Sequence, residues 1–107
     1  MTQSQPASRA PEPFERLDLA PGKSGTVLVE VPRVVVISIF PTPDTPGIWS
    51  GRVEVTRNGA RVFTSGIAGG SGAATPKLPA GSYVVKVAND FSSNDRARVD
   101  IFLAVAP

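Results

Sequence analysis

The chain has 107 residues, which is enough for one domain whose buried core can form without disulfides or a metal. It contains 11 prolines and 10 glycines, which suit turns between short strands better than helix interiors. Cysteine and histidine are absent, which excludes thiol nucleophiles, imidazole bases and the usual zinc ligands, and the net charge of +2 is too small for an electrostatic nucleic-acid binder.

The first segment, residues 1–13, is polar and contains Pro6, Pro11 and Pro13. Closely spaced prolines favour an extended, polyproline-like backbone and prevent a helix from starting. We therefore predict an extended proline-rich arm over residues 1–13, followed by a folded domain over residues 14–107.

From Phe14 onward, apolar and polar residues alternate, which is the pattern of half-buried strands. Two such stretches flank a turn over residues 20–25, and Pro32 should end the second because proline cannot donate to a strand ladder. The stretch over residues 34–40 is apolar on both faces, as expected of a central strand in a sandwich.

The dipeptide Asn58-Gly59 predicts a β-hairpin, because both residues tolerate the positive φ of a type I′ turn. A two-residue loop fixes which residues of the two strands face each other. The expected pairs are Val55 with Val62, Thr56 with Arg61, and Glu54 with Phe63, so that Val53, Val55 and Val62 contribute to the core.

After a loop of small residues over 66–76, the stretch LPAGSYVVKV at residues 78–87 has the form of a tyrosine corner. In such a corner the tyrosine hydroxyl bonds to backbone just upstream, so Tyr83 should reach residues 78–80 and should be buried. A last strand follows over residues 96–105, with Val99, Ile101, Leu103 and Val105 on one face and Arg98 and Asp100 on the other.

Residues 78–105 resemble the end of bacterial pre-peptidase C-terminal domains and similar immunoglobulin-like modules, in which a Leu–Gly–Tyr start is common. The resemblance implies a β-sandwich and an accessory role beside a secreted enzyme. With the strand pattern, it predicts an all-β fold: a single small antiparallel β-sandwich, Ig-like or jelly-roll-like, of about seven to eight strands.

No catalytic or cofactor-binding group is predicted. The stretch GKS at residues 22–24 lacks the upstream glycine and the following helix of a phosphate-binding loop. Serine and threonine have no base to activate them, and the carboxylates are scattered, so we expect no enzyme.

The loop NDFSSND over residues 89–95 contains Asn89, Asp90, Asn94 and Asp95, whose oxygens could bind calcium. Their spacing does not match an EF-hand, and the same residue types form ordinary turns between strands. We therefore expect a turn here, and neither a metal nor a cofactor in the protein.

Binding to partners is assigned to the prolines of the arm and to aromatic side chains. Trp49 has two interpretations, a surface anchor for a sugar or protein or a core residue at the start of a strand. Phe102 lies on the outer face of the last strand beside Ala104, which indicates a covered surface. The candidate set is Pro6, Pro11, Pro13, Phe14, Trp49, Phe91 and Phe102.

Two functions from different classes are compatible with these features. The first is a structural protein of a virion, such as a phage-like capsid decoration or minor capsid protein, docked through its arm on other protein chains or on copies of itself. The alternative is a carbohydrate- or surface-binding accessory module resembling the pre-peptidase C-terminal group. No partner nucleic acid or membrane insertion is expected. The first function places the protein in the virion. For the second, no signal peptide is visible in the sequence, and a soluble protein is expected.

Overall fold

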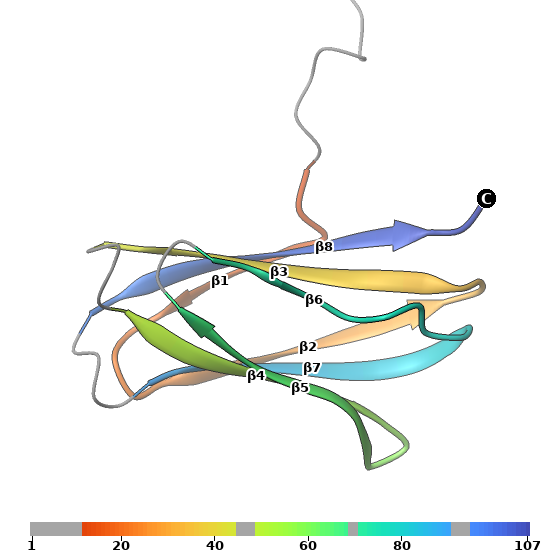
Figure 1. The fold of residues 1–107 in the computed structure, drawn as a ribbon, viewed down its shortest axis with the longest axis horizontal. Coiled ribbons are helices and arrows are strands. Elements are labelled where there is room, and N and C mark those ends of the chain that lie inside the picture. Colours follow the sequence, from red (N-terminus) through yellow and green to blue (C-terminus); the bar gives the residue numbers. More distant parts are fainter. Residues whose placement is uncertain (1–11, 45–48, 69–70, 91–94) are drawn as a thin grey trace, which may run out of the picture.

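The computed structural model describes residues 12–44, 49–68, 71–90 and 95–107 (Figure 1). They form eight strands, as the alternating pattern predicted. The strands are β1 (Glu15–Leu19), β2 (Ser24–Val31), β3 (Val35–Pro43), β4 (Ser50–Arg57), β5 (Ala60–Ala68), β6 (Ala73–Ala74), β7 (Gly81–Asn89) and β8 (Ala97–Val105). The second strand ends directly before Pro32, as expected of a residue without a backbone donor.

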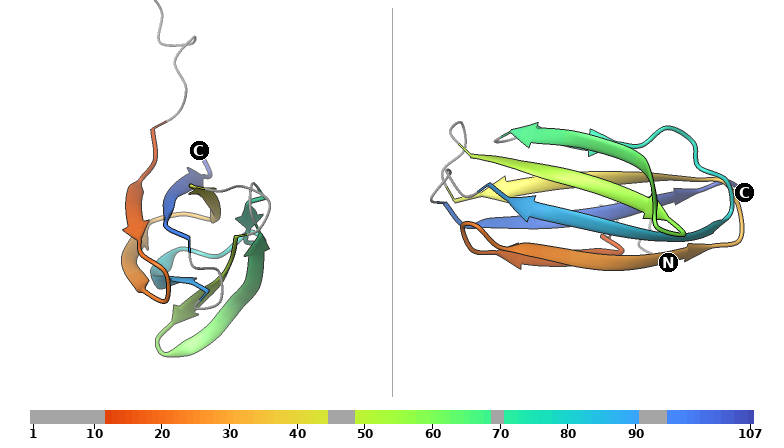
Figure 2. Two further views of the ribbon diagram at one scale, coloured as in Figure 1. Left: turned by 90° about the vertical axis from the view of Figure 1, so that its left-hand side faces the viewer. Right: turned by 90° about the horizontal axis from the view of Figure 1, so that it is seen from below.

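The strands form two four-stranded antiparallel sheets packed face to face, which confirms the predicted β-sandwich (Figures 1 and 2). One sheet has the order β1-β8-β3-β6 and is called the β8 sheet below; the other has the order β2-β7-β4-β5 and is called the β7 sheet. Neighbours in each sheet are mostly distant in sequence, so closure of the sandwich depends on long-range pairing.

Alternate residues of each strand point into the space between the sheets and make the core. Val29, Val53 and Val85 from the β7 sheet and Ile37 and Ile101 from the β8 sheet are completely buried. Fully burying one aliphatic side chain contributes about 1.5–3 kcal/mol, so this layer is the main source of stability. In β8 the inward series is buried through Ile101, but Leu103 is only partly buried and Val105 is exposed.

The hairpin forms at the predicted turn: Asn58 and Gly59 have φ values of 53° and 82°, and Arg57 pairs with Ala60 across it. The register beyond the turn differs from the prediction, because a β-bulge follows the Thr56–Arg61 pair. The observed partner of Val55 is Phe63, not Val62, and the partner of Glu54 is Thr64, not Phe63.

The bulge has a packing reason. It turns Val62 outward, where the side chain is 39% exposed, and packs the larger Phe63 against the core. Edge strands such as β5 tolerate a bulge, and burying a phenyl ring removes more apolar area from water than burying a valine. The predicted core position of Val62 is therefore wrong, whereas those of Val53 and Val55 are confirmed.

The tyrosine corner is confirmed. Tyr83 is 2% exposed, and its hydroxyl donates a hydrogen bond to the carbonyl oxygen of Pro79. The guanidinium of Arg57 lies 5.8 Å from the ring centroid, and its Nη2 atom donates to the carbonyl of Ala80 at 3.3 Å. The corner thus ties the entry of β7 to the end of β4.

Residues 1–11 of the predicted arm lie outside the described residues. Residues 12–14 rise from the start of β1 on the outer side of the β8 sheet, away from the core (Figures 1 and 2). The segment that precedes β1 therefore approaches the domain beside the outer face of this sheet. The boundary at residue 14 stays a prediction.

Replacing Gly59 by valine should lower the free energy of unfolding by about 1–2 kcal/mol, because a β-branched residue resists the positive φ of this position. A Cβ here would meet no atom within 4 Å, so the effect would come from the backbone alone. Denaturant unfolding measures it. Gly59→Asn is the matched control and should lose less, since asparagine tolerates this φ; equal losses would contradict the explanation.

Tyr83→Phe should cost about 0.5–1.5 kcal/mol, the usual net contribution of one hydrogen bond. The phenyl ring keeps the core packing and the contact with Arg57, so the variant isolates the hydroxyl. An unchanged unfolding midpoint in urea would show that the bond to Pro79 contributes nothing to stability.

Candidate functional site

Trp49 occupies the core, the second of its two predicted placements. The side chain is 1% exposed, and its indole Nε1 donates to Oδ1 of Asn89 at 2.8 Å. A Cβ at position 51 would lie 2.5 Å from the indole ring and 2.6 Å from the carbonyl oxygen of Ala88, so glycine is needed there. The alternative of an exposed anchor at Trp49 is wrong, because the ring is enclosed and its polar atom is already bonded.

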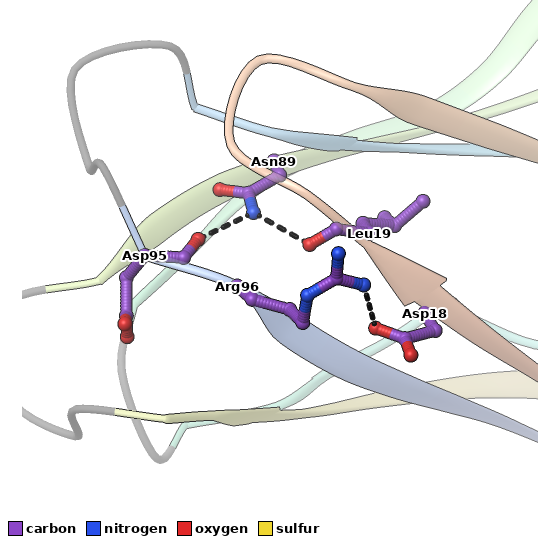
Figure 3. A network of polar contacts seen from close by, with 5 residues as sticks. All are labelled: Asp18, Leu19, Asn89, Asp95 and Arg96. Carbon is purple, nitrogen blue, oxygen red and sulfur yellow. Dashed lines mark hydrogen bonds and ion pairs between the residues drawn. The ribbon is translucent and has the colours of Figure 1, made fainter.

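Asn89 connects several segments at this end of the sandwich (Figure 3). Its Nδ2 donates to the carbonyl oxygens of Leu19 at 3.0 Å and Asp95 at 2.7 Å, while its Oδ1 accepts from Trp49. Beside it, Arg96 bonds to Asp18 at 2.9 Å across the surface. The buried amide therefore joins β1, β7, the residue before β4 and the approach to β8.

Two of the candidate calcium ligands, Asn89 and Asp90, form hydrogen bonds within the fold. The amide oxygen of Asn89 is occupied by the indole of Trp49, and Oδ2 of Asp90 accepts from the Ser50 hydroxyl at 3.0 Å. Phe91 and Asn94 lie outside the described residues. In the part of the chain that the structure describes, no group of three or more Asp, Glu, His or Cys residues could hold a metal ion.

Asn89→Ala should lower the free energy of unfolding by at least about 2 kcal/mol, because the Trp49 indole and the Leu19 carbonyl would lose their partner inside the protein. Thermal and urea denaturation measure this loss. Ser82→Ala, which removes an exposed hydroxyl 3.4 Å from Glu30, is the control and should change stability by less than about 0.5 kcal/mol. A similar small effect for Asn89→Ala would contradict the role given to the amide.

A second group of side chains lies on the outer face of the β8 sheet. Phe40 of β3 and Phe102 of β8 pack edge to face, with ring centroids 5.6 Å apart and ring planes at 77°. Phe40 remains 50% exposed and Phe102 is partly buried. In the antiparallel register Ser38 faces Phe102 and Phe40 faces Asp100, so aromatic and polar side chains alternate on this surface.

Asp100 is held by the neighbouring strand. Its Oδ1 lies 2.7 Å from Nε of Arg16 in β1, and these two residues are direct cross-strand partners. The side chain of Asp100 is only 16% exposed, whereas that of Arg16 is 54% exposed. The ion pair therefore fixes a partly buried carboxylate beside the two rings.

The two rings border a shallow surface cavity of about 500 Å³, called the aromatic hollow below. Its lining residues are Glu12, Ser38, Phe40, Asp100, Phe102, Leu103 and Ala104. They come from two adjacent strands and from the segment that precedes β1. An apolar depression with a few polar groups at its border is the usual form of a ligand site.

Apart from Trp49, which is buried in the core, the predicted partner-binding residues lie at the aromatic hollow, at the start of β1 or outside the described residues. Phe102 lines the aromatic hollow. Phe14, directly before β1, is 47% exposed, and its backbone nitrogen donates to the carbonyl oxygen of Ile101 at 2.7 Å. Pro13 lies beside Phe14, whereas Pro6, Pro11 and Phe91 are outside the described residues. Partner binding by these residues stays a prediction.

The other six lining residues were not in the predicted set: Glu12, Ser38, Phe40, Asp100, Leu103 and Ala104. The stretch over residues 34–40 did carry a signal, because it is apolar on both faces. The side of β3 that carries Phe40 is not covered by the second sheet, so its ring is left exposed. Sequence periodicity could not show that this face meets Phe102.

No model of a known protein family matches the sequence, and no curated protein matches it. Among solved structures, the chain is similar to the CBM36-1 domain of a multidomain xylanase from the hindgut metagenome of Trinervitermes trinervoides. The identity is 12% and the TM-score 0.54, with 84% of this chain and 77% of that chain covered. A carbohydrate-binding module CBM36 in complex with calcium and xylotriose matches at 15% identity and a TM-score of 0.49, covering 83% and 78% of the two chains.

The first similarity shows that the chain has the β-sandwich fold seen in a carbohydrate-binding domain. It does not single out the pre-peptidase C-terminal group, to which residues 78–105 bear a resemblance. The virion expectation receives no support from this similarity. Among the described residues, no helix is long and apolar enough to cross a membrane.

Proposed function

We propose that the chain is a non-catalytic carbohydrate-binding module, and that it holds a saccharide in the aromatic hollow on the outer face of the β8 sheet. The observation that carries this proposal is the pairing of two partly exposed phenyl rings with a serine hydroxyl and a fixed carboxylate on a single sheet face. The alternative from the sequence, a carbohydrate-binding accessory module, is therefore preferred to the virion component.

The chemistry of the aromatic hollow suits a sugar. The C–H faces of a pyranose ring are apolar and can pack on Phe40 or Phe102, while its hydroxyl groups need donors and acceptors nearby. Ser38 and Asp100 supply such groups within the same depression. The rings are held by a sheet whose inner face is buried, so little order has to be gained on binding.

The same residues argue against hydrolysis of the bound sugar. A glycosidase needs one carboxyl group in an apolar pocket as the acid and a second carboxylate opposite it. Asp100 is engaged in an ion pair with Arg16, and Glu12 is exposed before the first strand. The similarity in fold to the binding domain of a xylanase also supports a module that binds and leaves catalysis to another domain.

Phe102→Ala and Phe40→Ala should each weaken polysaccharide binding by roughly five- to thirtyfold, the effect of losing about 1–2 kcal/mol of contact. Depletion assays with insoluble xylan, cellulose, chitin and deacetylated chitin, followed by calorimetry with soluble oligosaccharides of the polymer that binds, measure the change. Both rings are partly exposed, so the variants should fold normally.

Leu28→Ala is the matched control, because Leu28 is 72% exposed on β2 of the opposite sheet. It should bind as tightly as the unaltered protein. The proposal fails if the unaltered protein binds no polysaccharide, or if Leu28→Ala loses as much affinity as the phenylalanine variants.

A further inference from the structure

The charges that line the aromatic hollow have one sign. Glu12 and Asp100 are its charged lining residues, and no lysine or arginine of the described chain lines it. Arg16 approaches Asp100 from the side of β1 and neutralises that carboxylate. The charge of Glu12 is not balanced by an ion pair within the described residues, so the aromatic hollow carries a net negative charge.

The arrangement of the two rings favours a cation as well. The face of a phenyl ring is the negative end of its quadrupole, and it attracts ammonium groups within about 6 Å. Because the planes of Phe40 and Phe102 meet at 77°, the two rings form a corner, not a flat platform. A group in this corner could contact two ring faces at once, which suits a compact cation better than an extended planar array of sugar rings.

We propose that the ligand of the aromatic hollow is an amino sugar with a free, protonated amino group, as in a deacetylated hexosamine polymer. This inference rests on the proposed carbohydrate-binding function and names its ligand class. The pyranose ring packs on one phenyl ring, and the ammonium group lies between the rings and the carboxylate of Glu12.

The alternative of an acidic sugar is less consistent with the site. A uronate would bring a carboxylate to a surface lined by Glu12 and Asp100, which would repel it. The guanidinium of Arg16 already donates to Asp100, and Arg16 lines a neighbouring depression formed by residues 12–16, which shares Glu12 with the aromatic hollow. A neutral sugar would form no ion pair with the carboxylate of Glu12.

The test compares four tetrasaccharides on the full chain by calorimetry: glucosamine, N-acetylglucosamine, cellulose-type glucose and galacturonate tetramers. At a pH at which the amino groups are protonated, the glucosamine tetramer should bind tightest, and its affinity should fall as salt is raised. Glu12→Gln should weaken its binding roughly two- to fivefold, the range for one exposed ion pair. It should leave binding of the glucose tetramer unchanged.

Glu30→Gln is the matched control, because Glu30 is an exposed carboxylate on β2 of the opposite sheet and should have no effect. If a neutral tetramer binds as tightly as the glucosamine tetramer and Glu12→Gln changes neither, the ligand class is wrong while carbohydrate binding stands. Preference for galacturonate would also overturn the inference. If no tetramer and no polysaccharide binds, the proposed function itself fails.

Discussion

The buried amide of Asn89 is the polar constraint on which this sandwich depends. A core of valine and isoleucine has no directional preference, so it can hold two sheets together without fixing how their ends meet. At this end of the molecule, the side chain of Asn89 bonds to Trp49, Leu19 and Asp95, and it thereby connects four segments of the chain, its own included. A polar group buried at 2% exposure must find these partners, and that requirement makes the arrangement specific.

The opposite end of β7 is fixed by a second polar contact, the bond from Tyr83 to Pro79. Between these two points β7 is a central strand, paired with β2 on one side and β4 on the other. Its inward residues Val85 and Val87 are completely buried. The strand is thus held at both ends by hydrogen bonds and along its length by apolar packing against the β8 sheet.

Strand β8 connects this core with the proposed site. Its inward residues Val99 and Ile101 are completely buried, whereas Asp100 and Phe102, between and after them, line the aromatic hollow. Because side chains alternate along a strand, the residues that stabilise the sandwich also hold the residues of the aromatic hollow in position. A site on a sheet face of this kind is placed more precisely than one on loops, and ligand binding needs little rearrangement.

The sequence by itself determined the all-β class, the Asn58-Gly59 turn, the corner at Tyr83 and the lack of imidazole and thiol chemistry, because each depends on local periodicity, backbone φ or residue type. The outward turn of Val62 could not be predicted, since the bulge depends on how Phe63 packs against the core. The proximity of Phe40, Phe102 and Asp100 could not be predicted either, because only the antiparallel pairing of β3 with β8 brings these residues together. That pairing joins strands far apart in sequence, and their register is decided by the packing of two inner faces, which no local pattern contains.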